Sequence, residues 1–471
     1  MTPLPANARL FVWFRVLFNA RFYYPVLAVF FVDVGLTLDQ YAVLNVAWAL
    51  SIVALELPLG ALGDQIGRRP LIVGAGVIML VEMGVLAFAH SLDRDVLFWI
   101  FVVNRVLSGA AEAAASGADE ALAYDTLVAE GREHDWPRVL TVLGRAMSGS
   151  MFVAMIVGAI VYDRSLMEPL FRAIGVDLPA GATVRFPAYL CLGLAVGAFV
   201  SALRMKEVSV PAGDGSAATP PEGGRMSLRD NWRGIVAAGR WIVGTRFALV
   251  VILFSLALDS VTRLFVTMTS TYFRLVEIPA RWFGVLSASF AAIGMITPGI
   301  ARRMVAARSP VTNFVVVAVL MLAGLVVIAT LVGWPGVAAI ALLGGGWHLL
   351  GFFVSHYLNA VTSSSRRATV LSFKSLAGNL AYGIAGWTFA FGLRALSGGA
   401  APEPNSPAEA AAFVAALKWI PAAFAAAVLP LAIWAMRSPR MRNVSASGDR
   451  SPPGAPPSTP RAPRESRTSS R

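Results

Sequence analysis

The chain has 471 residues, of which 57% are hydrophobic and only 14% are charged, and its formal net charge is +12. A soluble protein carries about 25% charged residues, so this composition excludes an ordinary soluble globular protein. The single cysteine, Cys191, excludes a disulfide framework within one chain and a metal site built from cysteines.

Twelve long apolar stretches follow one another along the chain. A hydrocarbon core of about 30 Å takes about 20 mostly apolar residues per helix. Backbone in hydrocarbon has to satisfy its own hydrogen bonds, so the sequence predicts an all-α integral membrane protein with twelve transmembrane helices. The predicted spans are 11–32, 41–62, 71–89, 96–118, 139–162, 186–203, 247–273, 283–301, 311–332, 337–361, 368–393 and 410–436.

The positive charge is distributed unevenly around these spans. With the N-terminus in the cytoplasm and twelve crossings, most of the 39 Lys and Arg residues fall on the cytoplasmic side. Cytoplasmic loops of membrane proteins carry such an excess. We therefore predict a multi-pass protein of the cell inner membrane with both termini in the cytoplasm, whose partner is the lipid bilayer and not nucleic acid.

The spans divide the chain into four parts. We expect an N-terminal six-helix bundle at 1–204, a cytoplasmic connector at 205–246, a C-terminal six-helix bundle at 247–437 and a disordered cytoplasmic tail at 438–471. The tail is rich in Pro, Ser and Arg, a composition that does not form a core. Residues 227–244 of the connector alternate Arg with apolar side chains, which indicates either an amphipathic helix on the inner leaflet or the first turns of the seventh span.

The segment from Gly60 to Arg69 lies between the second and third spans and reads Gly-Ala-Leu-Gly-Asp-Gln-Ile-Gly-Arg-Arg. It resembles the cytoplasmic loop between helices 2 and 3 of major facilitator superfamily transporters, whose pattern is Gly-x-Leu-Ala-Asp-Arg-x-Gly-Arg-Arg. The chain departs from that pattern at Gly63 and Gln65. It matches at Gly60, Leu62, Asp64, Gly67, Arg68 and Arg69.

This resemblance implies two six-helix bundles with pseudo-two-fold symmetry and a transport site between them. It also implies that the loop acts as a latch that holds one conformation, with Asp64 accepting bonds from the arginines or from a helix N-terminus. In the family an acidic residue near the end of helix 4 joins such a latch. Asp125 is our candidate, and Asp119 and Glu120 compete with it. The alternative is an ordinary positively charged turn.

Many ionisable residues lie inside the predicted spans. Each costs about 2.5–3.5 kcal/mol to insert, so such residues usually face a cavity or a charged partner. We take this pattern as a sign of a transport pathway. The residues concerned are Arg15, Arg21, Glu56, Glu82, Arg105, Glu112, Arg145, Asp259, Arg263, Lys374 and Lys418.

Arg105 opens the run Arg-Val-Leu-Ser-Gly, which is similar to the helix-four motif Arg-x-x-x-Gly of the family. The resemblance implies a role in proton coupling. Glu112 lies two helical turns further on and on the same face. The two residues either exchange partners when a proton binds or form a static pair.

The other candidates differ in how firmly the sequence assigns them a role. Glu56 is either a proton site or a buried partner of Arg15 or Arg21, whereas Glu82 is expected to be structural. Asp259 and Arg263 are spaced as a helical ion pair, so they either neutralise each other or contribute to coupling. Lys374 and Arg145 together would make a cavity positive, which suits an anionic substrate.

The sequence favours a transporter over an enzyme. It contains no Gly-x-x-x-x-Gly-Lys-Ser/Thr run for ATP and no His-Glu-x-x-His run for a metal, so we expect no cofactor and no metal. We predict a monomeric secondary active transporter of a small molecule that works by alternating access. The coupling ion is a proton, with sodium as an alternative, and transport runs in the direction of export. The alternatives are a proton-coupled uptake symporter for an organic anion or sugar and, more remotely, an integral-membrane transferase.

Overall fold

A computed structural model describes residues 3–90, 93–208, 228–362, 364–399, 402–437 and 441. Within these ranges the side chains of Asp64, Ala291, 228–231 and 364–368 are not described. The predicted tail lies outside the described residues except for Met441, and so does the part of the connector at 209–227. The described residues form helices joined by short turns, and they contain no strand.

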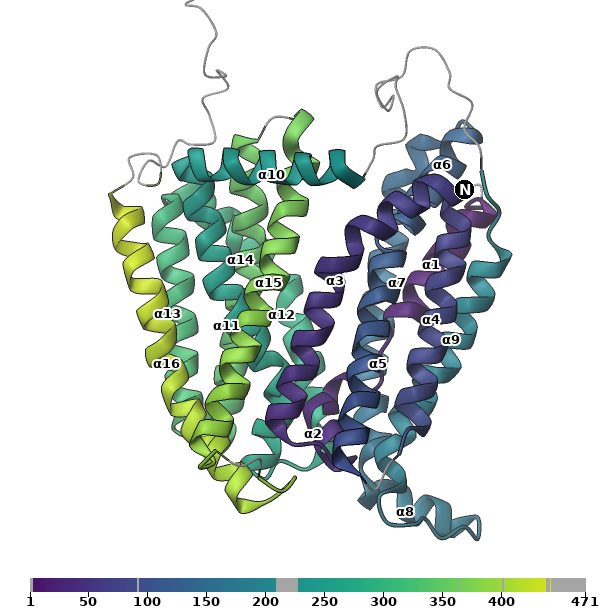
Figure 1. The fold of residues 1–471 in the computed structure, drawn as a ribbon, viewed down its shortest axis with the longest axis vertical. Helices are drawn as coiled ribbons and strands as arrows, with labels where there is room; N and C mark the ends of the chain where they lie inside the picture. The colour runs from purple at the N-terminus through teal and green to yellow at the C-terminus, as the bar shows by residue number, and fades with distance from the viewer. Residues whose placement is uncertain are drawn as a thin grey trace, which may run out of the picture.

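The first half of the chain forms one helical bundle, drawn from purple to blue in Figure 1. Its first predicted span is broken at Ala20–Tyr23, and the short turn of helix that follows, Tyr24–Val26, contains Pro25. The fourth span is broken at Gly117, whose φ of 79° is disfavoured for other residues. The helices are α1 (Ala6–Asn19), α2 (Leu27–Asp33), α3 (Leu38–Ile66), α4 (Arg68–Phe88), α5 (Arg94–Ala115), α6 (Ala118–Ala129), α7 (Trp136–Tyr162), α8 (Arg164–Ala173) and α9 (Phe186–Arg204).

The second half forms another bundle, and one helix of the connector lies across the end of it (Figure 1). That helix, α10, lies in the segment 227–244, where an amphipathic helix was one of our two expectations. The helices are α10 (Leu228–Gly244), α11 (Arg246–Leu275), α12 (Ala280–Ala307), α13 (Pro310–Ala329), α14 (Gly333–Val361), α15 (Ser364–Leu396) and α16 (Pro407–Met436).

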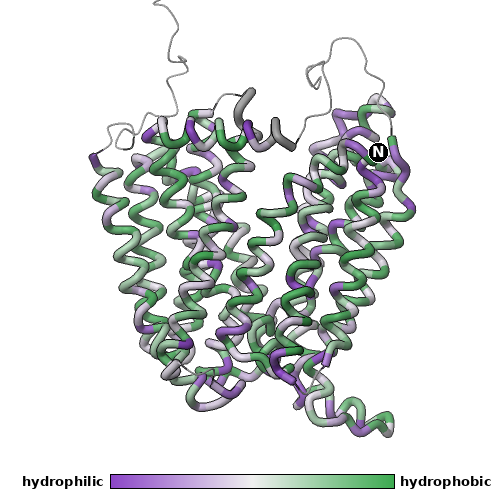
Figure 2. The backbone as a smooth tube through the Cα atoms, in the orientation of Figure 1, coloured by the Kyte–Doolittle hydropathy of each residue, from purple (hydrophilic) through white to green (hydrophobic). Residues whose placement is uncertain are grey.

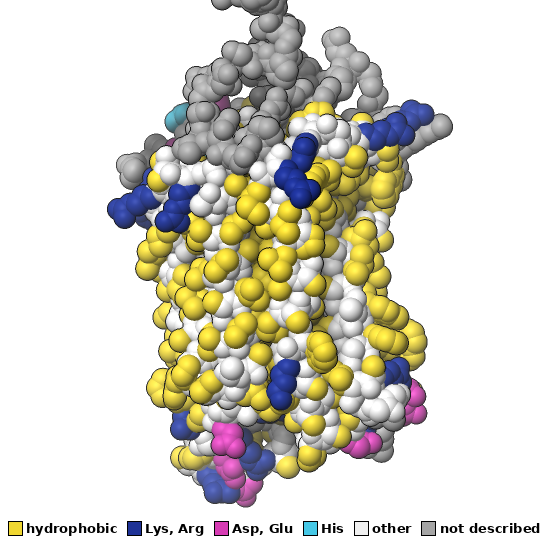
Figure 3. Space-filling model, turned by 90° about the vertical axis from the view of Figure 1, so that its left-hand side faces the viewer, with side chains coloured by type: hydrophobic (Ala, Val, Ile, Leu, Met, Phe, Trp, Pro, Cys, Tyr) yellow, Lys and Arg dark blue, Asp and Glu magenta, His cyan; other side chains and the backbone are white. Residues whose placement is uncertain are grey.

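Eleven stretches of helix in the described residues are long and apolar enough to cross a bilayer. The twelfth predicted span corresponds to α15, which is long enough at 33 residues but is interrupted by Lys374, Ser375 and Asn379. Figure 2 shows apolar residues along the length of the helices and polar residues mainly at their ends. Figure 3 shows an apolar surface between charged side chains at the two ends, as expected for a protein that faces lipid.

The segment from Gly60 to Arg69 differs from its predicted form. We expected a loop across these residues, but α3 continues to Ile66 and α4 begins at Arg68. Gly67 alone makes the turn, with a φ of 96° that is open to glycine and disfavoured for residues with a Cβ. The motif is therefore mostly helical, and the chain reverses at one glycine.

The two bundles converge at the end that carries α8 and diverge toward the end that carries α10 (Figure 1). We call these the α8 end and the α10 end. The bundles pack against each other most extensively through α3 with α15 and α7 with α12, and α2 also packs on α11. The second pair meets closely at Gly284, where an added Cβ would lie 2.2 Å from the carbonyl oxygen of Met155.

Replacing Gly284 by alanine should therefore lower the melting temperature of the purified protein, because α7 or α12 would have to move. Overpacking of this kind costs about 1–3 kcal/mol. Gly299→Ala on the same helix is the matched control, since no heavy atom lies within 4 Å of its added Cβ. Equal melting temperatures of the two variants would contradict the close packing of α7 on α12.

Candidate functional site

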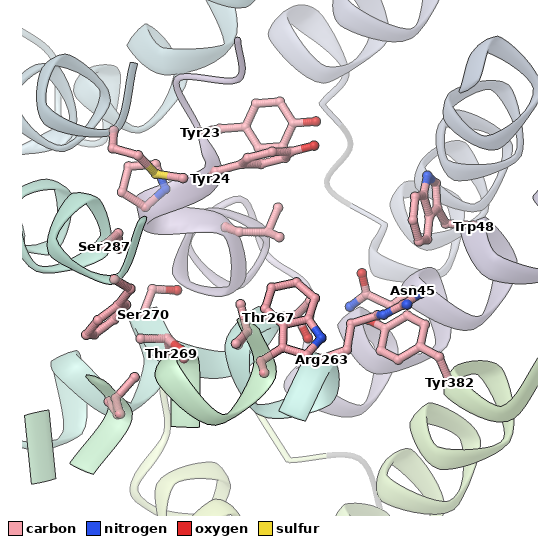
Figure 4. Close-up of a pocket in the computed structure, with 18 of the residues that line it drawn as sticks. Tyr23, Tyr24, Asn45, Trp48, Arg263, Thr267, Thr269, Ser270, Ser287 and Tyr382 are labelled. Carbon is pink, nitrogen blue, oxygen red and sulfur yellow. The ribbon is translucent and has the colours of Figure 1, made fainter. Parts of the chain in front are cut away.

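A cavity of about 390 Å³ lies between the two bundles and is lined by both of them. Figure 4 shows its aromatic and hydroxyl side chains facing the same space from several helices. We call it the central cavity. The residues that give it its chemical character are Tyr23, Tyr24, Asn45, Trp48 and Arg105 from the first bundle and Arg263, Thr267, Ser270, Trp347, His348 and Tyr382 from the second.

The fixed charges of the central cavity are positive. Arg105 and Arg263 line it, and no Asp or Glu is among the described residues that do. Arg105 is only 6% exposed, and its guanidinium carbon lies 4.9 Å from the centre of the Phe31 ring. Two of its nitrogens, Nε and one Nη, have no hydrogen-bond partner in the described structure. A buried cation with unused donors is suited to a ligand that accepts hydrogen bonds.

The glycine of the helix-four motif explains how Arg105 is held. A Cβ at Gly109 would lie 1.8 Å from Ser51 Oγ and 2.9 Å from the carbonyl oxygen of Trp48. Only glycine lets α5 approach α3 so closely, and this contact fixes the face of α5 that carries Arg105. Glu112 does not line the central cavity, and no ion pair joins it to Arg105 in the described residues.

A second cavity of about 250 Å³ lies within the second bundle, between α11, α14 and α15. Asp259 Oδ2 accepts a hydrogen bond from Arg263 at 2.7 Å, and Asp259 Oδ1 accepts one from Trp347 Nε1 at 2.7 Å. Arg263 also donates to Asn379 Oδ1 at 2.9 Å. Lys374 lines the same cavity. Arg263 and Trp347 line both cavities, so one cluster of polar side chains separates them.

The structure shows which acids pair with the two arginines Arg15 and Arg21 of the first bundle. Arg15 pairs with Asp119 at 2.5 Å, and Arg21 lies 3.7 Å from the fully buried Glu82. The hypothesis that Glu56 is the partner of Arg15 or Arg21 is therefore wrong. Asp119 and Glu82 lie next to these arginines in space, although spacing in the sequence did not indicate it. Glu56 is left with one buried carboxylate oxygen that has no partner in the described structure.

Lys374 and Arg145 do not act on a common cavity in this structure. Lys374 lines the second cavity, whereas Arg145 is exposed on α7 and lines neither of the two cavities described above. The positive character of the central cavity comes instead from Arg105 and Arg263.

The residues of the predicted latch meet at the α10 end. Arg68 forms an ion pair with Asp125 on α6, while Asp119, a competitor for that role, is taken by Arg15. The side chain of Asp64 lies outside the described part, and Gly60 is a helical residue of α3 with no heavy atom near its missing Cβ. Arg69 donates to the carbonyl oxygen of Met205 at 2.6 Å, which ties α4 to the end of α9.

Glu207 is a member of this cluster that the sequence did not reveal. Its carboxylate accepts hydrogen bonds from the backbone N–H groups of Arg68 at 3.2 Å and Arg69 at 2.8 Å. An anion at a helix N-terminus is stabilised by the exposed N–H groups and the helix dipole. We had expected Asp64 to accept such bonds. Glu207 is far away in the sequence, so no local spacing links it to Gly67 and α4.

A second polar network, which sequence reasoning also missed, joins the two bundles at the α8 end. Arg274 on α11 donates to both oxygens of Asp33 on α2, at 2.6 and 2.7 Å, and Tyr162 on α7 also donates to Asp33. Glu409 on α16 accepts a hydrogen bond from the backbone N–H of Leu38 at 2.7 Å. These contacts close the α8 end beneath the central cavity, and we call them the α8-end network.

Two bundles of membrane-spanning helices, with a cavity between them that is closed at one end, define an integral-membrane transporter and not an enzyme. The match to known proteins agrees. The model of the Major Facilitator Superfamily matches residues 10–386, and the chain belongs to that family. The family and the all-α membrane fold that we predicted are confirmed.

Individual relatives are more distant. The chain is 27% identical over 134 residues to the inner membrane transport protein YajR of Escherichia coli (strain K12), a match that covers 28% of this chain and 27% of that protein. The structure of the nucleoside transporter NupG (D323A mutant) is similar with a TM-score of 0.68 at 11% identity, covering 92% of this chain and 99% of that one. The inward-facing, unoccupied structure of a bacterial homolog to the human lysosomal transporter Spinster gives 0.66 at 15%, covering 92% and 97%.

Arg68→Ala and Glu207→Gln should each leave the protein inserted in the membrane but slow transport several-fold. Both changes release the start of α4 from its neighbours, Arg68 from Asp125 and Glu207 from two backbone donors. The measurement is the initial flux per reconstituted molecule in vesicles. Arg204→Ala is the control, because Arg204 is an exposed cation at the same end of α9. Unchanged flux in both variants would contradict a latch at this position.

Asp33→Asn should weaken the α8-end network and raise the population of molecules open at that end. The test places spin labels at two exposed positions of the α8 end, Ile174 and Trp334, in a Cys191→Ser background and measures the distance between them. A longer distance should appear in Asp33→Asn.

Glu403→Gln is the control for this test. It also removes an ion pair between the bundles, with Arg94, but Glu403 is 77% exposed, and such pairs contribute about 0–1 kcal/mol. The same distance distribution in Asp33→Asn and Glu403→Gln would show that the contacts of Asp33 do not hold the α8 end closed.

Proposed function

We propose that this protein is a monomeric secondary active transporter that moves a small organic molecule through the central cavity by alternating access. The observation that supports this most strongly is the central cavity itself, which both bundles line and which the α8-end network closes on one side. A cavity between two bundles changes its access when the bundles rock against each other. Both bundles come from one chain, so a single molecule is sufficient.

We infer that the α10 end faces the cytoplasm. The excess of Lys and Arg in the loops of that end supports this orientation, because cytoplasmic loops carry such an excess. The bundles diverge toward the α10 end, so the arrangement corresponds to an inward-facing state (Figure 1). The relative from Escherichia coli is named as an inner membrane protein, which favours the same location for this chain.

We infer that the coupling ion is a proton. Carboxylates within membrane spans are costly and usually serve a function. The candidates are Glu56 and Glu112, which form no ion pair in the described residues, and Asp259, which is paired with Arg263. Glu56 and Glu112 lie outside the lining of the central cavity, whereas Asp259 contacts two of its lining residues. Sodium is the competing ion, and the experiment below separates the two.

A second candidate concerns direction and substrate. Export of a small molecule is our first expectation, and uptake of an organic anion together with a proton is the alternative. The charges of the central cavity favour the alternative, because two arginines and no carboxylate line it in the described residues. An organic cation would find no counter-charge there.

The test is transport by purified protein in proteoliposomes with an imposed pH gradient, screened over organic anions, nucleosides and sugars. We expect at least one compound to accumulate and to be lost when a protonophore collapses the gradient. Gly344→Leu should abolish this flux because it fills part of the central cavity, while Gly299→Leu, outside that cavity, should not. Accumulation that follows sodium and ignores the protonophore would overturn proton coupling, and equal flux in both variants would overturn the site.

A further inference from the structure

Arg263 occupies an unusual position in the described structure, because it forms part of the wall of both cavities. On the side of the central cavity it lies against the Tyr382 ring, with 5.3 Å between the guanidinium carbon and the ring centre (Figure 4). On the side of the second cavity it is held by Asp259 and Asn379. A change in the charge of Asp259 therefore alters the position or charge balance of Arg263 at the wall of the central cavity.

Asp259 holds two residues of the cavity wall, one with each carboxylate oxygen. Oδ2 accepts from Arg263 and Oδ1 accepts from Trp347, both at 2.7 Å. Both hydrogen bonds are strongest when the Asp259 carboxylate is ionised. Protonation of either oxygen removes the charge that neutralises Arg263 and weakens the bond that orients Trp347. The two side chains respond to one proton.

Asp259 supplies the negative charge that offsets the cations around it. The groups that face it are Arg263 on its own helix α11, Trp347 on α14, and Lys374 and Tyr382 on α15. The helices α2, α10, α12 and α16, which also pack on α11, contribute no charged residue to the described lining of either cavity. Asp259 is the one carboxylate among the described lining residues of the two cavities. When it is neutral, Arg263 and Lys374 have no counter-charge there.

We propose that Arg263 binds the anionic group of an aromatic organic anion in the central cavity after Asp259 has taken up a proton. This inference rests on the proposed function and names its substrate class and coupling residues. Asp259 and the substrate anion compete for one guanidinium, so the proton that neutralises Asp259 favours the anion. Proton and anion therefore travel together, as in a symporter, and by linkage each tightens the binding of the other.

The remaining residues of the central cavity fit the same ligand. Arg105, buried on the opposite bundle with unused donors, supplies a second cation that meets the anion when the bundles close around it. Tyr23, Trp48 and Trp347 present aromatic surfaces that stack on a planar apolar body. A neutral sugar would not compete with Asp259 for the guanidinium of Arg263, so its binding would not depend on the charge of Asp259.

The first experiment measures binding of 2-naphthoate to the purified full-length protein at pH 8 and pH 6. A carboxylate of this kind stays ionised at both values, since its ordinary pKa is about 4. We expect wild-type affinity to rise by at least about tenfold at pH 6, within the usual range for coupled ligands. The neutral 2-naphthamide should show no such change. Absence of naphthoate binding, or binding that is equal at both values, overturns the proposal.

Variants assign the effect to the two residues. Asp259→Asn should bind naphthoate with high affinity at both pH values, since it resembles the protonated state, and should exchange naphthoate across vesicles without accumulating it under a pH gradient. Arg263→Gln should lose binding, and Arg263→Lys should recover part of it. Glu403→Gln, far from both cavities, should behave as wild type. A pH-dependent Asp259→Asn would show that the proton binds elsewhere.

Trp347→Phe provides a further readout that a merely structural role would not move. The change keeps an aromatic ring but removes the N–H donor to Asp259. The ionised carboxylate is then less stabilised, so the pH midpoint of the change in naphthoate affinity should move to higher pH. An unchanged midpoint overturns the link between Trp347 and Asp259. Failure of this proposal can be told apart from failure of the proposed function. If naphthoate binding is independent of pH but other compounds are transported under a pH gradient, only the anion mechanism is refuted. If no compound is transported, both are refuted.

Discussion

The free energy of a charge in hydrocarbon is the constraint on which the rest of this structure depends. It accounts for the pairs Arg15–Asp119 and Arg21–Glu82, which join helices of the first bundle. It also accounts for the cluster around Asp259 in the second bundle. Arg105 is a buried cation without an ion-pair partner in the described residues, and it lies at the central cavity.

The two ends of the molecule use polar groups for different purposes. At the α10 end the contacts of Arg68, Arg69 and Glu207 lie within the first bundle and fix the start of α4. At the α8 end the contacts of Asp33 and Arg274 run between the bundles. If the bundles rock as proposed, contacts at one end are replaced when the other end closes, and the α8-end network belongs to one state of the transport cycle.

Sequence reasoning succeeded where the physical rule is local. Span length and hydropathy identified the membrane helices, since each helix has to satisfy the bilayer on its own, and the motif around Gly67 and Arg105 identified the family. The i, i+4 spacing of Asp259 and Arg263 gave an ion pair that the structure contains. Reasoning failed where partners are distant. It paired Glu56 with Arg15 or Arg21 as one alternative, and it missed Glu207 and the α8-end network.

The sequence by itself determined the class of protein, the helical spans and several of the charges inside them, such as Arg21, Glu82 and Arg105, because these follow from composition and from spacing along one helix. Only the tertiary structure decided which charges meet. The contacts between Arg274 and Asp33, between Glu207 and α4, and between Trp347 and Asp259 join residues that are far apart in sequence. Their distances are set by how helices pack against each other, and a glycine such as Gly109 or Gly284 that permits close packing is recognisable only when its neighbour is known.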